Sequence, residues 1–211
     1  MAAAGFVPHL VRAAHQPCPD LVSGSEAKAH LSHTALRLAL ASAFASGALE
    51  TGAHAFLPTL VSGKLWQASS PLLAASAFSS GAIVSQLPLG VLVDRIGSER
   101  IHRQIAVLLL VLGCALTWTM AASIGSLFIF LSGASTACLY TLAVLSIAAS
   151  SKQITERIAK VAMAYTLGGF VGPICIGATV SLIGASALGC TVLATGLGLL
   201  VVQYSTKARV G

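Results

Sequence analysis

Six apolar stretches, each about as long as a lipid bilayer is thick, dominate this sequence and are separated by short connections. A hydrocarbon core of about 30 Å needs roughly 20 apolar residues per helix. Windows of that kind cover residues 38–61, 66–93, 104–122, 125–149, 161–183 and 186–205. Backbone polar groups in lipid must be satisfied within the segment, which favours helices. The sequence therefore predicts an all-α integral membrane protein with six transmembrane helices.

The composition excludes several other classes of protein. Of the 211 residues, 56% are hydrophobic and only 9% are charged, which argues against a soluble enzyme, a disordered chain and a nucleic-acid binder. Four of the five cysteines lie inside apolar stretches, so we expect neither disulfides nor a metal site. Residues 1–35 mix Pro, Ser, Gly and His and read as a flexible polar lead-in. Residues 36–211 then form one transmembrane domain.

The positions of the basic residues predict an orientation. Lys and Arg are retained on the cytoplasmic side of a membrane during insertion. Of the 12 Lys and Arg residues, all except Lys64 lie before the first apolar stretch, after the second, after the fourth or after the sixth. We therefore expect both termini to be cytoplasmic, in the cytoplasmic (inner) cell membrane.

A short motif follows the second apolar stretch and begins at Gly90. Three apolar residues lead to Asp94 and Arg95, and one further apolar residue separates them from Gly97. Gly90 allows close helix approach, Asp94 can accept hydrogen bonds from amides at a helix N-terminus, and Gly97 permits the positive φ of a tight turn. Arg95 and Arg100 hold the loop on the cytoplasmic side. An ordinary positive-inside turn is the alternative interpretation.

This segment resembles the signature loop between the second and third helices of each half of the major facilitator superfamily (MFS). The resemblance implies a gating loop, formed by Gly90, Asp94, Arg95, Gly97 and Arg100, in which Asp94 latches the cytoplasmic face. Ser98 and Glu99 depart from the pattern, because the family usually has basic residues there.

Two later segments are also similar to MFS sequences. The stretch from Tyr140 resembles part of the tenth helix, and the stretch with Gly168, Gly172 and Pro173 resembles the Gly-Pro pattern of the fifth and eleventh helices. The glycines favour close packing and Pro173 favours a bend, although plain helix packing also accounts for them. No charge lies in the fourth apolar stretch, where first halves usually carry Arg, so the chain resembles a C-terminal six-helix MFS half. Such a half would pair as a homodimer or with a second six-helix half.

Glu50 and His54 are the only ionisable side chains well inside an apolar stretch. Glu50 falls midway between Arg37 and Lys64, near the expected bilayer centre, and His54 lies one helical turn further along. A charge there costs roughly 2.5–3.5 kcal/mol on insertion scales, so the side chain should face the protein interior or a water-filled cavity. We expect Glu50 to couple protons or bind substrate, with His54 tuning it. The alternative is a neutral carboxyl that only hydrogen-bonds a neighbouring helix.

Three further polar-tipped side chains are candidates for a substrate cavity: Gln86, Tyr140 and Tyr165. Tyr140 is favoured because it falls in the stretch matched to the tenth helix. For Gln86 and Tyr165, interhelical hydrogen bonding is the stronger interpretation.

The sequence thus predicts a secondary transporter half that moves a small-molecule substrate across the lipid bilayer by alternating access. The alternative is a truncated or orphaned half that acts as a non-transporting membrane protein or interaction partner. We expect no enzyme and no cofactor, since neither a nucleophile motif nor a metal-ligand set is present.

Overall fold

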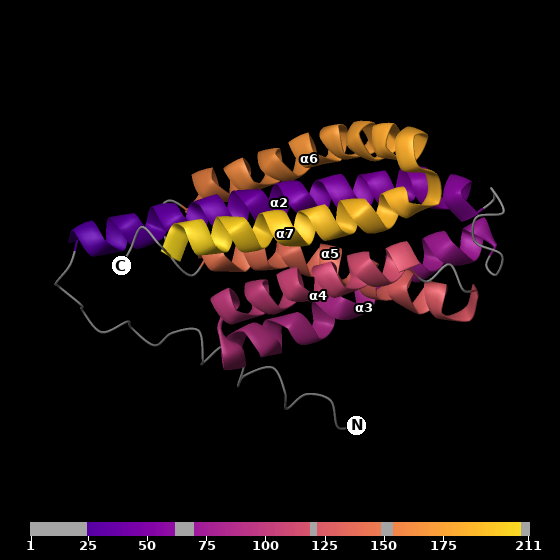
Figure 1. The fold of residues 1–211 in the computed structure, drawn as a ribbon. Coiled ribbons are helices and arrows are strands. Elements are labelled where there is room, and N and C mark those ends of the chain that lie inside the picture. The colour runs from indigo at the N-terminus through magenta and orange to yellow at the C-terminus, as the bar shows by residue number, and fades with distance from the viewer. Residues whose placement is uncertain (1–24, 62–69, 119–121, 149–153, 208–211) are drawn as a thin grey trace, which may run out of the picture.

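The computed structural model describes residues 25–61, 70–118, 122–148 and 154–207, and these form long α-helices with no strand (Figure 1). They are α2 (Ser25–Leu60), α3 (Pro71–Ile96), α4 (Ser98–Trp118), α5 (Ala122–Ala148), α6 (Ile154–Ile183) and α7 (Ala187–Lys207). A 3-10 turn, η3 (Gly184–Ser186), joins α6 to α7. The all-helical prediction is confirmed for this part of the chain.

Five of these helices, α3 to α7, are long and apolar enough to cross a membrane by length and composition. This agrees with a multi-pass membrane protein. α2 is 36 residues long but does not reach the same standard of hydropathy. Its apolar stretch is interrupted by Glu50, Thr51 and His54, the polar residues that made it a candidate for function.

Several helices begin earlier than their apolar stretches predict. α2 begins at Ser25, within the predicted lead-in of residues 1–35, and residues 1–24 lie outside the described residues. α4 begins at Ser98 and α6 at Ile154, each six or seven residues before the predicted span. The added turns contain Glu, Lys, Arg and Ala, which are good helix formers whether or not they lie in lipid.

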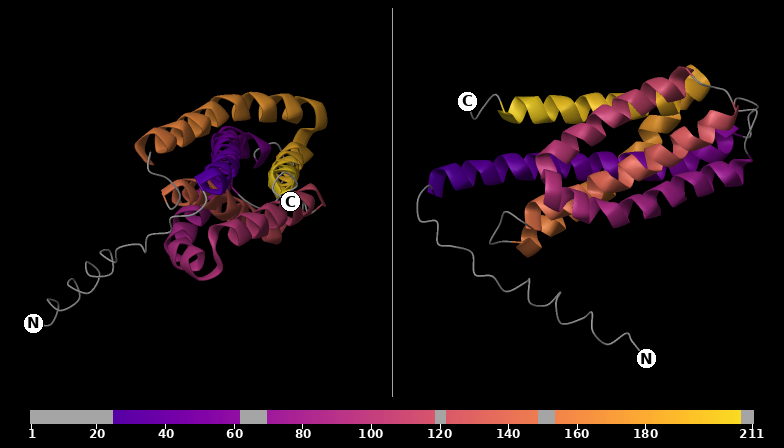
Figure 2. Two further views of the ribbon diagram at one scale, coloured as in Figure 1. Left: turned by 90° about the vertical axis from the view of Figure 1, so that its left-hand side faces the viewer. Right: turned by 90° about the horizontal axis from the view of Figure 1, so that it is seen from below.

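The helices pack as three principal pairs: α2 on α6, α3 on α5, and α4 on α7. α2 also packs on α5, which places α6, α2, α5 and α3 side by side in one layer. α4 and α7 form a second layer against α5 and α2 (Figures 1 and 2). Fully buried leucines fill the space between the layers. They include Leu109, Leu139 and Leu142.

The packing has an internal two-fold pattern. Exchanging the unit α2–α3–α4 with the unit α5–α6–α7 turns the α2·α6 pair into α5·α3 and leaves α4·α7 unchanged. Matching glycines mark the two exchanged crossings: Gly47 and Gly168 lie on α2 and α6, and Gly133 and Gly81 lie on α5 and α3. At all four, a Cβ atom would overlap a backbone carbonyl oxygen of the opposite helix. Because each unit has three helices, the second runs in the opposite direction to the first (Figure 1).

The outward surface is apolar, most of all on α3 and α6. Only 17% of the apolar window of each of these two helices is buried, compared with 56% for α5. Large apolar side chains on α3 and α6 point outward. Among them are Leu72, Ile83, Leu87, Phe170, Ile174 and Leu182. A surface of this kind suits a lipid or protein environment rather than water.

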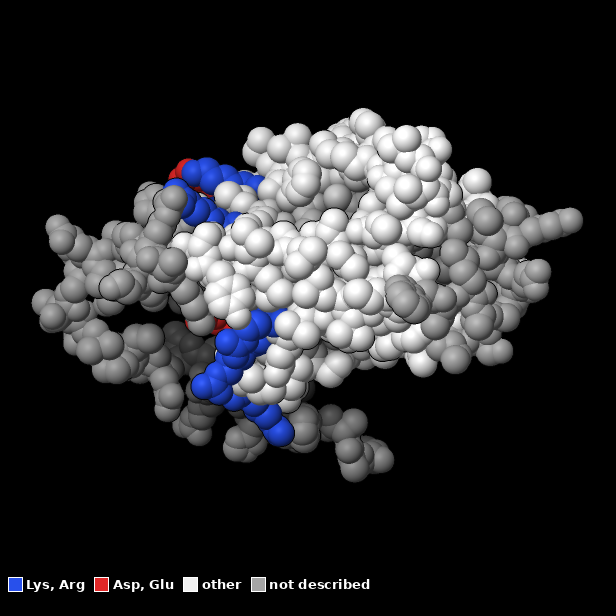
Figure 3. Space-filling view, in the orientation of Figure 1, with Lys and Arg blue, Asp and Glu red and all other residues white. Residues whose placement is uncertain are grey.

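Charged side chains gather at one end of the bundle. Figure 3 shows the Lys and Arg side chains of this face at the end where α3 ends and where α4 and α6 begin. At the opposite end, η3 carries no charge. Among the described residues, the end where α4 and α6 begin therefore carries more charge than the end at η3.

Candidate functional site

The close approach of α2 and α6 brings Glu50 and Tyr165 together. Glu50 lies about one turn beyond Gly47 on α2, and Tyr165 lies one turn before Gly168 on α6. Since neither glycine has a side chain, the two backbones come close enough for a short bridge. The Tyr165 hydroxyl donates a hydrogen bond of 2.8 Å to Glu50 Oε2. Thr51 Oγ1 adds a second link across the same crossing, 3.0 Å from the Gly169 carbonyl oxygen.

A third helix contributes Tyr140. Its ring lies against the ring of Tyr165, with centroids 4.8 Å apart and planes inclined by 55°. α5, which carries Tyr140, is tied to α2 by a buried hydrogen bond of 2.8 Å from Ser46 Oγ to the Thr136 carbonyl oxygen. We call Glu50, Tyr140 and Tyr165 the Glu50 cluster. Its members come from α2, α5 and α6.

The Glu50 cluster lies at one end of an apolar core shared by the same three helices. Ala39, Ala43, Ala143, Ile147 and Val161 are fully or almost fully buried there, and both tyrosine rings pack against this core. The core occupies the part of the bundle nearest the charged end. The cluster therefore places one carboxyl group beside closely packed apolar side chains of α2, α5 and α6.

The chemistry of the Glu50 cluster is that of one carboxyl group and two phenols. Within the described residues, the Glu50 carboxyl group receives one hydrogen bond, from Tyr165, so Oε1 keeps its acceptor capacity. Glu50 is half-buried and lies 13 residues after Arg37, which is about 20 Å along the helix. A carboxyl group in such a place can exchange a proton or accept hydrogen bonds from a polar ligand.

His54 and Gln86, two of the predicted site residues, make no hydrogen bond or ring contact with the Glu50 cluster in the part of the chain that the structure describes. The His54 ring is exposed and stands edge-on to Phe78 of α3, with ring centroids 5.3 Å apart and an interplanar angle of 82°. The partner of the His54 ring is thus an aromatic ring, and no contact between His54 and Glu50 among the described residues supports the predicted tuning. Gln86 is exposed on α3.

The predicted gating loop is a very short turn between α3 and α4. Gly97 has φ 89°, so the positive φ expected there is confirmed, and its N–H donates to the Val93 carbonyl oxygen at 2.9 Å. Asp94, Arg95 and Arg100 are all exposed.

Two expectations for this loop find no support among the described residues. A Cβ atom at Gly90 would meet nothing within 4 Å, because this face of α3 points outward, so Gly90 has no close helix neighbour among the described residues. Asp94 likewise accepts no amide hydrogen bond from the part of the chain that the structure describes. The turn at Gly97 is so tight that α4 begins at Ser98, four residues after Asp94.

The small residues of α6 do pack closely, as predicted. Cβ atoms at Gly168 and Gly172 would overlap the Phe44 and Ala48 carbonyl oxygens of α2. α6 continues through Pro173 and follows a curved path in both views (Figures 1 and 2). The curvature agrees with the missing backbone hydrogen bond of a proline inside a helix.

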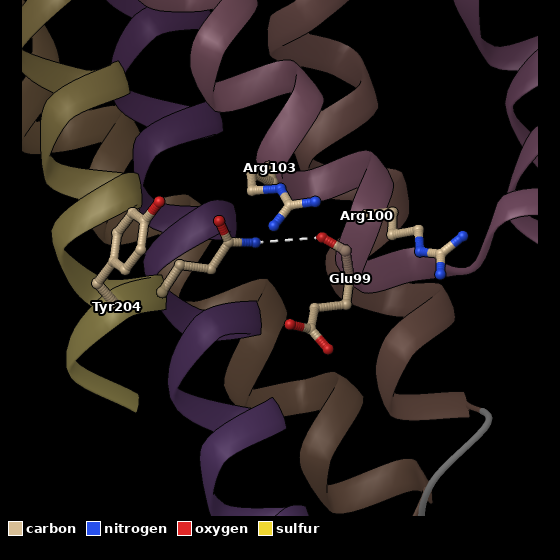
Figure 4. A pocket seen from close by; sticks show the side chains of 5 residues that line it. Glu99, Arg100, Arg103 and Tyr204 are labelled. Atoms are coloured by element: carbon tan, nitrogen blue, oxygen red, sulfur yellow. Dashed lines mark hydrogen bonds between the residues drawn. The ribbon is translucent and has the colours of Figure 1, made fainter. Parts of the chain in front are cut away.

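A pocket at the charged end was not predicted. It has a volume of about 270 Å³ and lies between the start of α4 and the end of α7. Gln203 Nε2 donates to the Glu99 carbonyl oxygen at 3.2 Å, and Arg103 lies beside this bond, whereas Arg100 points away from Tyr204 (Figure 4). In the sequence, Gln203 is a single polar residue in the last apolar turn, which is the only signal that could have indicated it.

The described residues contain no group of three or more His, Cys, Asp or Glu side chains that could hold a metal ion. In comparisons with known proteins, no family model, no curated protein and no solved structure matches the chain.

Proposed function

We propose that the chain is one six-helix half of an MFS-like secondary transporter, with both termini cytoplasmic. In this proposal α2 crosses the membrane in addition to the five helices α3 to α7. The half lies in the cytoplasmic membrane and moves a small molecule by alternating access. Proton coupling runs through Glu50. The observation that carries the proposal is the 2.8 Å hydrogen bond from Tyr165 to Glu50, which is part-buried between the long helices α6 and α2.

The cost of a carboxyl group in lipid supports a functional role for Glu50. Ionisable side chains in membrane helices are costly and are typical of substrate or proton pathways. Glu50 interrupts the apolar stretch of α2 without an ion-pair partner among the described residues, so it does not serve as half of a salt bridge there. Tyr140 and Tyr165 surround it with polar-tipped rings that can change partners when Glu50 gains or loses a proton.

The arrangement of the helices supports the MFS-like part of the proposal. Two three-helix units of opposite direction, related by a two-fold exchange, are the internal repeat expected of an MFS half. The exchange of α2·α6 with α5·α3, and the matching glycines at both crossings, agree with that pattern.

A second half would complete the pathway. In transporters built of repeats, the substrate site lies at the interface between repeats near the bilayer midplane. The layer formed by α6, α2, α5 and α3 carries the Glu50 cluster, and its two outer helices have the most exposed apolar windows. A second copy of the chain, or another six-helix half, would cover this layer and enclose the cluster.

The alternative is an orphaned half that transports nothing. The Tyr165–Glu50 hydrogen bond also agrees with this alternative, because it gives a neutral carboxyl group a partner on a neighbouring helix. A coupling role requires that Glu50 can gain and lose a proton, whereas a structural role requires only its hydrogen bond.

The test is pH-driven uptake by the full chain in proteoliposomes, with a panel of small molecules that includes organic cations, organic anions and sugars. We expect Glu50→Gln to lower pH-driven accumulation at least tenfold, because the amide cannot carry a proton. Glu156→Gln is the matched control, since Glu156 is an exposed carboxyl group paired with Lys160. Equal pH-driven uptake by wild type and Glu50→Gln would remove the coupling role.

A further inference from the structure

A groove opens between α3 and α4 although only Gly97 separates the two helices in sequence. α3 packs mainly on α5 and α4 mainly on α7, so the two helices diverge from their shared turn (Figure 2). The resulting hollow has a volume of about 290 Å³. Its walls are the Pro88 and Leu92 side of α3 and the Ile105 and Leu108 side of α4.

The groove is apolar along its walls and basic at its mouth. Arg95 lies one turn beyond Leu92 on α3, and Arg100 lies one turn before Gln104, which lines the groove on α4. Both arginines are exposed, and neither forms an ion pair with a described residue. They lie on either side of Gly97, each about one helical turn from a residue that lines the groove, so both helices carry a cation near its charged end.

The acidic residues of the same turn do not occupy that mouth. Glu99 and Arg100 both line the pocket near α7, but their side chains diverge, and Arg100 points away from Tyr204 (Figure 4). Asp94 precedes Arg95 by one residue, and successive helical residues point about 100° apart. The cation pair at the mouth is thus left with its positive charge available to a ligand.

We propose that this groove binds one acyl chain of an anionic phospholipid, whose phosphate lies against Arg95 and Arg100. The apolar walls match a hydrocarbon chain, and the basic mouth lies at the charged end of the bundle, where a headgroup would be if the helices cross a membrane. The proposal requires the chain to lie in a membrane but does not require it to transport anything. Transport by Glu50 and lipid binding at this groove can therefore fail separately.

The experiment is native mass spectrometry of the full chain in mild detergent, titrated with dioleoyl-phosphatidylglycerol or dioleoyl-phosphatidylcholine. We expect one tight site for phosphatidylglycerol, with at least tenfold preference over phosphatidylcholine. The double variant Arg95→Gln/Arg100→Gln should lose roughly tenfold or more of its phosphatidylglycerol affinity. Arg37→Gln/Arg103→Gln removes two cations elsewhere at the same end and should stay within twofold of wild type.

A second pair of variants tests the groove itself. Gln104→Trp keeps the charge at the mouth but fills the groove, so it should weaken binding of both lipids. Gln86→Trp is its control, because Gln86 is an exposed glutamine of α3 that does not line the groove. A melting curve of each variant shows that it is folded.

Three results would overturn the proposal. The first is equal affinity of the wild type for both lipids, and the second is an unchanged preference in Arg95→Gln/Arg100→Gln. The third is competition by glycerol 3-phosphate as strong as that by the intact lipid, because this would indicate a phosphate site that does not use the apolar groove.

Discussion

The Tyr165 hydroxyl and the Glu50 carboxylate meet across the α2–α6 crossing at 2.8 Å, although 115 residues separate them in the chain. This contact depends on the glycines that bring the two helices together, since side chains at Gly47 or Gly168 would overlap the opposite backbone. A change that separates the two helices should therefore also break the hydrogen bond between Tyr165 and Glu50.

The energy of this contact can be measured with a double-mutant cycle. Tyr165→Phe keeps the ring against Tyr140 and removes only the donor, and Glu50→Ala removes the acceptor. We expect a coupling free energy of about 0.6 kcal/mol, with an upper limit of about 1.7 kcal/mol, as for other hydrogen bonds between membrane helices. Unfolding titrations of the four proteins in mixed micelles supply the numbers. Additive effects of the two changes would show that the pair does not interact.

Close packing at the α2–α6 crossing gives a second prediction. Gly168→Ala places a methyl group on the Phe44 carbonyl oxygen, so we expect a loss of about 1–3 kcal/mol in the free energy of unfolding. Gly90→Ala is the control, because Gly90 is also helical but has open space around it. That change should be neutral or should stabilise by up to about 1 kcal/mol. The opposite order of the two effects would refute the helix pairing.

The sequence predicts the apolar helices well because their signal is local. Hydropathy over about 20 residues located α3 to α7, and Gly97 was indicated by the tight turn that its neighbours require. Helix starts were less accurate, since α4 and α6 extend beyond their apolar windows into polar turns whose residues favour helix on their own.

The candidate site was predicted residue by residue but not as a cluster. Glu50, Tyr140 and Tyr165 each stand out as polar residues in apolar stretches, yet their meeting depends on which helices pair. A single sequence shows that a glycine permits close approach without showing which neighbour uses it. For that reason both Gly168 and Gly90 were interpreted as sites of close approach, although only Gly168 has a close helix neighbour among the described residues.

Orientation in the membrane can be tested with single cysteines in a variant that lacks the native ones. Arg100→Cys lies at the charged end of the bundle, and Ser186→Cys lies in η3 at the other end. In intact cells, a membrane-impermeant maleimide should label Ser186→Cys. It should label Arg100→Cys only after the membrane is permeabilised. The reverse pattern would invert the topology, and equal labelling of both sites in intact cells would argue against a membrane-spanning bundle.

The pairing of the chain in its own membrane tests the central claim most directly, because one half alone leaves the Glu50 cluster without an opposing wall. Single cysteines at Leu87 of α3 and Phe170 of α6, both highly exposed, can be cross-linked in intact membranes. The mass of the complex in mild detergent is then compared with that of the chain. We predict a stable dimer, or a complex with one other six-helix protein, joined through these positions. A strict monomer at both sites and in detergent would contradict the account of this chain as half of a transporter.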